Sequence, residues 1–184
     1  MRILLTRSTC SIAITFAILA CCSLRAQPAK AQATEMSCRE TVRSFYDWYV
    51  PRALRRSATP AWAIAAKERS NAFSSELSQL LKEDSEAQAK AVGDIVGLDF
   101  DPFLYTQDPA NRYALGKITT KGESCLVEVG RPQQRIEKPA VTAELVYRHD
   151  QWVFTNFHYG KSAYSQDENL LAILKKLQAD RRPR

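Results

Sequence analysis

Acidic side chains crowd one short segment of the chain, where they could bind a cation or exchange protons. Asp99 and Asp101 lie in the stretch Leu98-Asp99-Phe100-Asp101-Pro102-Phe103, and Asp108 follows close behind. An EF-hand calcium loop needs glycine at its sixth position and a bidentate acid at its twelfth. Counted from Asp99, leucine and alanine occupy those positions, so the spacing does not fit calcium. Because aspartate beside proline is ordinary turn chemistry, we expect Asp99 and Asp101 to cap the backbone of a turn.

Two histidines are the side chains best suited to proton transfer near neutral pH. His149 falls in an expected hairpin turn, where we expect water to surround it. His158 falls on the same face of an alternating strand as Trp152 and Phe154, and could therefore point into a concave pocket. We expect a hydrogen-bonded structural role for His158, with acid–base catalysis as the alternative.

Four aromatic residues lie between positions 45 and 49. Val42, Phe45 and Trp48 recur with helical spacing, which predicts a helix with one apolar stripe. We expect this stripe to pack in the core against a sheet. A partly open apolar pocket, with the Tyr46 and Tyr49 hydroxyls as its polar points, is the functional alternative.

Established catalytic motifs do not stand out in this sequence. It lacks a serine-nucleophile motif, a glycine-rich phosphate loop and a clustered set of histidines and cysteines. We therefore expect no catalytic residues, no metal ligands and no cofactor.

The first 33 residues have the order of a cleavable signal peptide. Arg2 and Arg7 precede an apolar run from Ser11 to Leu24, and small residues end at Ala31-Gln32-Ala33. The run is shorter than the roughly 20 residues that span a bilayer as a permanent helix. We expect a periplasmic or secreted protein whose mature chain has no transmembrane span.

A second processing signal makes it an open question whether the exported chain is anchored to a membrane. Ile18-Leu19-Ala20-Cys21 resembles a lipoprotein box, in which Cys21 would be acylated and would become the first mature residue. Cleavage after Ala33 would instead release a soluble chain that begins at Thr34. Both a soluble protein and a membrane-anchored lipoprotein remain as interpretations.

Charge and length describe one small domain behind the signal. Residues 1–33 hold four of the 26 basic residues and none of the 20 acidic ones, so the remaining chain has a net charge of only +2. The basic excess therefore gives no argument for a nucleic-acid partner. About 150 residues are enough for one domain with a core. We expect a single domain over 34–180 and a basic, frayed tail over 181–184.

Cys38 and Cys125 are the two cysteines that follow the expected cleavage site. An even pair in an oxidising compartment predicts a disulfide. Two free buried thiols are the alternative.

Helical periodicity at both ends of the domain encloses a central region of alternating residues. Ser37 and Glu40 form a capping-box pattern, which predicts a helix from Cys38 that frays or kinks near Pro51. Further helices are expected over 61–69, from Ser74 or Ser75 to 90, and over 166–178, and strands over 112–119, 124–129, 141–148 and 152–159. The charged end of the third helix is expected to be solvated. This order predicts an α+β fold, with helices on one face of a curved antiparallel sheet of about four strands.

Several of these segments resemble a family of small exported bacterial proteins, domain-of-unknown-function family 3828. The resemblance covers residues 39–177, and its most specific part is Leu98–Phe103. It implies a fold similar to the nuclear transport factor two cone, in which helices pack in the concavity of a bent sheet, and it implies no activity. The segments that carry it are Phe45-Tyr46-Asp47-Trp48-Tyr49, Ser75-Glu76-Leu77, Leu98–Phe103, Gln107-Asp108 and Trp152.

The functional expectation is a non-catalytic cell-envelope module that binds a protein or a small apolar ligand. A small isomerase-like or hydrolase-like enzyme that uses His158 in a concave pocket is one alternative, and an inhibitor or immunity-type protein is another. The candidate pocket residues are Tyr46, Tyr49, Asp99, Asp101, Asp108 and His158.

Overall fold

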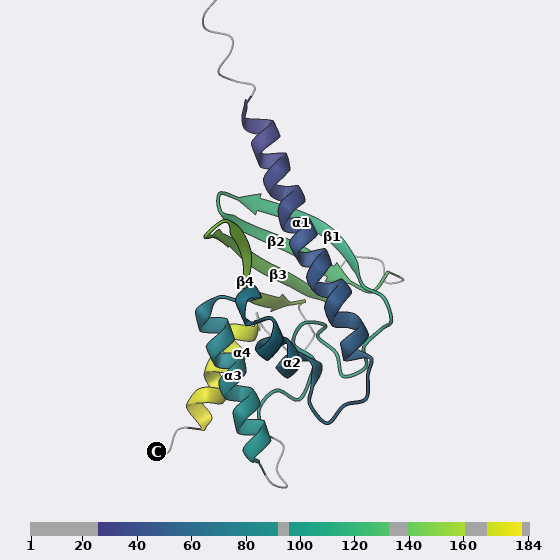
Figure 1. The fold of residues 1–184 in the computed structure, drawn as a ribbon, viewed down its shortest axis with the longest axis vertical. Coiled ribbons are helices and arrows are strands. Elements are labelled where there is room, and N and C mark those ends of the chain that lie inside the picture. The colour runs from purple at the N-terminus through teal and green to yellow at the C-terminus, as the bar shows by residue number, and fades with distance from the viewer. Residues whose placement is uncertain (1–25, 92–95, 133–139, 161–168, 182–184) are drawn as a thin grey trace, which may run out of the picture.

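Helices precede and follow a single four-stranded sheet (Figure 1). The computed structural model describes residues 26–91, 96–132, 140–160 and 169–181. Most of the expected signal, including Cys21, lies outside these residues. The elements in chain order are α1 (Ala26–Ala53), α2 (Ala61–Glu68), the 3-10 helix η1 (Ser70–Ala72), α3 (Ser75–Lys90), β1 (Ala114–Lys121), β2 (Ser124–Gly130), β3 (Val141–Arg148), β4 (Gln151–Tyr159) and α4 (Leu170–Asp180).

The sheet is an antiparallel meander in the order β1-β2-β3-β4. Alternate residues of β2 and β3, such as Val127 and Ala143, are buried on the face that meets the helices. Figure 1 shows α1 crossing this face over β1 and β2, with α2, α3 and α4 gathered towards β4. The predicted α+β class is confirmed.

Two departures from ideal pairing shape β4. His149 and Asp150 both have positive φ, at 49° and 62°, which gives the β3–β4 hairpin a tight two-residue turn. Further along, Glu144 pairs with Asn156 and Leu145 pairs with Phe154, so Thr155 is an extra residue in the ladder. A bulge of this kind shifts the side-chain alternation by one position.

Helix α1 begins at Ala26, so the predicted start at Cys38 is wrong. The Ser37 hydroxyl lies inside the helix, where it donates to the Thr34 carbonyl at 3.0 Å and accepts from the Trp152 indole N–H at 3.0 Å. The preceding residues are rich in alanine and glutamine, which favour helix and extend it past the capping pattern. The expected end near Pro51 agrees with the last residue, Ala53.

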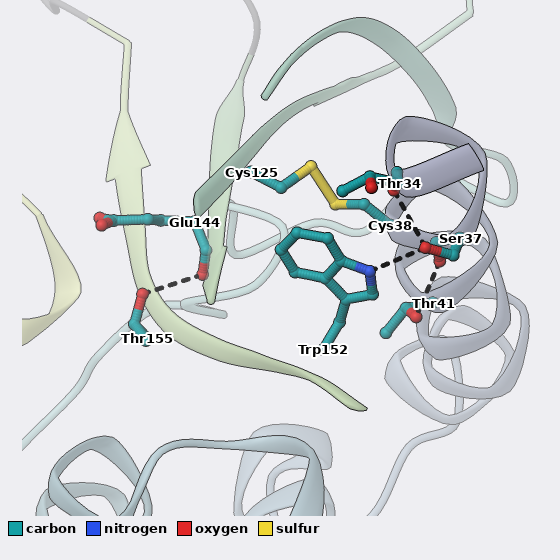
Figure 2. The surroundings of a disulfide bond; sticks show 8 residues. All are labelled: Thr34, Ser37, Cys38, Thr41, Cys125, Glu144, Trp152 and Thr155. Atoms are coloured by element: carbon teal, nitrogen blue, oxygen red, sulfur yellow. Dashed lines mark hydrogen bonds between the residues drawn. A yellow bond between two sulfur atoms is a disulfide. The ribbon is translucent and has the colours of Figure 1, made fainter. Parts of the chain in front are cut away.

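A disulfide joins α1 to the sheet. Cys38 and Cys125 are bonded, with their Cα atoms 6.7 Å apart, and both side chains are fully buried. Figure 2 shows the bond beside Trp152, whose indole reaches across to Ser37. The predicted pairing is confirmed.

Phe45 is the hub of the core. Its ring stacks on that of Tyr49 at 5.5 Å and meets the rings of Phe103 at 5.4 Å and Phe154 at 4.8 Å. These contacts join α1, the 98–108 loop and β4. Aromatic pairs at such distances add about 0.5–1.5 kcal/mol each beyond the burial of their area.

The charged end of α3 was expected to be solvated, but Asp84 within it is fully buried. Its carboxylate accepts from the Leu98 backbone N–H at 3.0 Å and pairs with the guanidinium of Arg181. Gly97 has φ +85°, and a Cβ there would lie 2.6 Å from the Asp84 carboxylate. Arg181 is therefore part of the domain rather than of a frayed tail.

Polar side chains cap the starts of α3 and α4. The Ser74 hydroxyl accepts from the Leu77 N–H and caps α3, as predicted. Asn169 caps α4, whose predicted first residues, 166–168, lie outside the described part of the chain. Among the described residues, none of the helices combines the length and the apolar character that a membrane span requires.

The disulfide should contribute much of the stability. Closure of a loop of about 88 residues is worth roughly 4.5 kcal/mol in chain entropy. We expect Cys38→Ala/Cys125→Ala to lose several kcal/mol of unfolding free energy in urea titrations. A loss below about 1 kcal/mol would show that the bond adds little.

Arg181→Met should be strongly destabilising, because it leaves the buried Asp84 carboxylate without its cation. We expect a loss of roughly 3 kcal/mol in urea unfolding. Addition of Asp84→Asn should recover part of this loss, while Arg55→Met, at an exposed arginine, should change the free energy little. Equal stability of Arg181→Met and Arg55→Met would contradict a structural role for the pair.

Candidate functional site

Asp101 organises the loop that follows α3. One oxygen of its carboxylate accepts from the backbone N–H groups of Phe103 at 3.0 Å and Leu104 at 3.1 Å. The other accepts from the Tyr49 hydroxyl of α1 at 2.6 Å. The prediction that Asp101 caps a turn is confirmed.

Two more tyrosines hold the same loop from different elements. The Tyr46 hydroxyl of α1 donates to the Phe103 carbonyl at 2.7 Å. The Tyr159 hydroxyl of β4 donates to the Pro102 carbonyl at 3.0 Å. Because these hydroxyls bind the backbone of Pro102-Phe103, they fix the buried Phe103 ring against the core.

Burial controls the ionisation of this centre. It raises the pKa of Asp101 to about 6, although the hydrogen bonds from Tyr49, Phe103 and Leu104 act in the opposite direction. Burial also raises the pKa of Tyr46 and of Tyr49, and the negative charge of Asp101 raises both further. The two tyrosines are therefore neutral donors at physiological pH, and Asp101 changes charge near pH 6.

The other predicted acids lie apart from this centre. Asp99 is exposed, and its carboxylate accepts no hydrogen bond from a described residue, so the prediction that Asp99 caps the turn is wrong. Asp108 is also exposed and contributes its carbonyl, which accepts from Arg131 at 2.6 Å. Within the described ranges, no three residues among His, Cys, Asp and Glu are grouped so as to hold a metal ion.

His158 lies on the face of the sheet that points away from the helices. The extra residue Thr155 reverses the alternation, so Phe157 and Tyr159 point inward in place of His158. The His158 ring nitrogen Nε2 lies 2.7 Å from Glu144 on the same outer face, and its side chain is 42% exposed. The expectation that His158 shares a face with Trp152 and Phe154 is wrong.

An open groove runs along α1 beside Trp48, and we call it the Trp48 groove. Its cavity volume is about 360 Å³. It is bounded by α1, by the junction of α2 and η1, by the end of η1, and by β4. Its lining residues are Glu40, Thr41, Ser44, Phe45, Trp48, Arg69, Ala72 and Phe154.

Arginines flank the partly exposed indole of Trp48. The guanidinium carbon of Arg52 lies 4.0 Å from the ring centroid, and that of Arg69 lies 4.9 Å from it. Arg52 is held in place because it also donates to the Trp48 carbonyl at 2.7 Å. Arg69 makes no hydrogen bond or ion pair through its guanidinium to a described residue, and neither does the Glu40 carboxylate.

Other grooves have different linings. Between α2 and α3 lies a cavity of about 720 Å³ with many hydroxyl groups, and a further one of about 500 Å³ lies between α3 and the β3–β4 turn. Lys82 lines both. Tyr46 lines a smaller hollow of about 250 Å³ with Tyr113. Asp101 and His158 line none of these grooves.

The six predicted pocket residues therefore do not share one cavity. Tyr46, Tyr49 and Asp101 meet in the core, whereas the remaining three lie apart at the surface. Sequence reasoning missed Glu40 and Arg69. The repeat of Glu40, Ser44 and Trp48 at four-residue steps was the available signal, because it marks one face of a helix.

Comparisons of the chain with protein families, with curated proteins and with solved structures find no match.

Asp101 should make stability depend on pH. Its pKa is about 6 in the folded chain and 3.8 without the fold, so ionisation opposes folding. Unfolding free energy should fall as pH rises from about 4 to 6, by up to about 3 kcal/mol, and level off above pH 6. Asp101→Asn should remove this component, as judged by urea titrations from pH 4 to 7. Asp108→Asn is the control; if both variants keep the wild-type profile, Asp101 is not the titrating group.

Proposed function

We propose that this chain is a non-catalytic binding module of the cell envelope, and that the Trp48 groove receives a small ligand with an apolar part. The observation that carries this proposal is that some polar groups of the domain are used by the fold, whereas others are left available to a ligand. Asp101 and Tyr49 use their hydrogen bonds to hold the fold together. The charged groups of Arg69 and Glu40, in contrast, line an open groove and make no hydrogen bond to a described residue.

The size and floor of the groove support a small ligand. Its volume of about 360 Å³ falls within the range of about 300–1,000 Å³ that is typical of ligand pockets. Phe45 and Phe154 form a floor that is already packed against the core. Because these rings are fixed, binding would not need a rearrangement of the core.

The compartment is part of the same proposal. The Cys38–Cys125 disulfide supports an oxidising environment, such as the periplasm or the outside of the cell. The signal-like N-terminus supports export, either as a soluble protein cleaved after Ala33 or as a lipoprotein anchored through Cys21.

We also propose that the chain belongs to domain-of-unknown-function family 3828 and has its cone-like fold. The element order supports this proposal, because in the described part of the chain the α-helices α1, α2 and α3 precede the antiparallel sheet and α4 follows it (Figure 1). The roles of the motif segments support it too. Phe45, Tyr46 and Tyr49 of the first motif are buried in the core. The Leu98–Phe103 segment supplies the loop that Tyr46 and Tyr49 hold.

A fluorescent probe tests the groove. The dye 1-anilinonaphthalene-8-sulfonate combines apolar rings with one negative charge, which suits the floor and Arg69. We expect saturable enhancement of its fluorescence. The affinity for the dye should fall at least fivefold in Trp48→Leu. Trp48 is partly exposed, so this variant should keep the wild-type near-ultraviolet circular dichroism of the remaining tryptophans.

Lys82→Ala is the matched control, because Lys82 lines the two larger grooves and not the Trp48 groove. It should leave the response of the dye unchanged. Loss of the response in Lys82→Ala, or an unchanged response in Trp48→Leu, would place binding elsewhere and contradict the proposal.

A further inference from the structure

Two opposite charges line the Trp48 groove, and the protein neutralises neither. Arg69 lies over Trp48, and Glu40 lies two helical turns before Trp48 on α1. Both side chains are without a hydrogen bond or ion pair within the described ranges. A ligand with one charge of each sign would satisfy both.

Glu40 lines the groove from α1, and Arg69 lies over Trp48 of the same helix, so the step from Glu40 to Trp48 gives the length of the groove along α1. Glu40 and Trp48 are eight residues apart on α1, which is about 12 Å along the axis. A free amino acid carries its ammonium group and its carboxylate on one carbon, so it is shorter than this stretch of α1. An extended peptide rises about 3.3 Å per residue, so three residues span roughly 10 Å.

We infer that the Trp48 groove binds an extended peptide of about three residues by its two free termini, with the carboxylate at Arg69 and the ammonium group at Glu40. This inference rests on the proposed function and names the ligand class of that site.

The position of Arg69 suits a carboxylate. A planar guanidinium that lies over an aromatic ring keeps the N–H groups at its edge free, and these match the two oxygens of a carboxylate. Arg52 on the same indole already donates to the Trp48 carbonyl. Arg69 lines the groove and makes no such bond to a described residue, so its N–H groups are available to a ligand.

The middle of the groove suits a peptide with an apolar central side chain. Phe45 and Phe154 offer the aromatic floor that such a side chain would cover. Ser44 is exposed between the two charges, and its hydroxyl makes no hydrogen bond to a described residue. It can donate to, or accept from, the peptide backbone.

The test compares Ala-Phe-Ala with blocked forms of the same peptide, by NMR titration at low ionic strength. Amidation of the C-terminus should weaken binding at least tenfold, because it removes a charge-assisted pair of hydrogen bonds. Acetylation of the N-terminus should weaken it about threefold, since an ammonium–carboxylate pair at the surface lacks the two-pronged geometry of a guanidinium–carboxylate pair. Free phenylalanine should bind at least tenfold more weakly than the tripeptide.

Variants assign each terminus to its partner. Arg69→Gln should weaken Ala-Phe-Ala at least tenfold and leave the amidated peptide unaffected. Glu40→Gln should abolish the difference between the free and the acetylated peptide. Arg55→Gln and Glu86→Gln, at exposed charges outside the groove, are the matched controls and should change no affinity. Because Glu40 and Arg69 are exposed, the melting temperature should not change.

Equal affinities for the free, acetylated and amidated peptides would overturn the recognition of the termini. Failure of the tripeptide to bind, while the naphthalene sulfonate still binds in a Trp48-dependent way, would overturn the peptide inference and leave the proposed function standing. Failure of both probes would overturn both.

Discussion

The hydrogen bond between Tyr49 and Asp101 is the contact on which the arrangement of the domain depends. It joins α1 to the 98–108 loop, and the same carboxylate closes the turn that inserts Phe103 into the core. Burial of this acid carries a cost, as its raised pKa shows, and three hydrogen bonds offset that cost. The cost is tolerated because the turn positions the ring that Phe45 packs against.

Two anchors then make α1 a fixed ridge. The disulfide holds it at Cys38 and the Asp101 contact holds it at Tyr49, which are about 16 Å apart along the axis. Glu40 and Trp48 lie between these anchors and line the open groove. A groove on such a ridge is preformed, so ligand binding would cost little conformational entropy of the protein. The contacts that stabilise the fold thus also position the candidate site.

Local signals predicted most of the fold. Alternation gave the strands, the cysteine pair gave the disulfide, and Asp101 before proline gave the turn. The failures depended on tertiary context. The bulge at Thr155 turned His158 outward. Asp84 belongs to a charged run that was predicted to be solvated, but its pairing with Arg181 allows it to be buried. The groove was missed for the same reason, because Arg69 meets Trp48 only after α2 folds back beside α1.

The central claim is that the Tyr49–Asp101 centre is structural and that the Trp48 groove binds the ligand. Mapping of peptide contacts by amide and indole chemical shifts tests this claim most directly. A titration with Ala-Phe-Ala should shift the Trp48 indole N–H and the backbone amides near Ser44 and Ala72. The amides of Phe103 and Leu104, which Asp101 holds, should stay unchanged. Shifts concentrated at Phe103 and Leu104, with Trp48 unaffected, would place the ligand at the carboxylate and contradict the account.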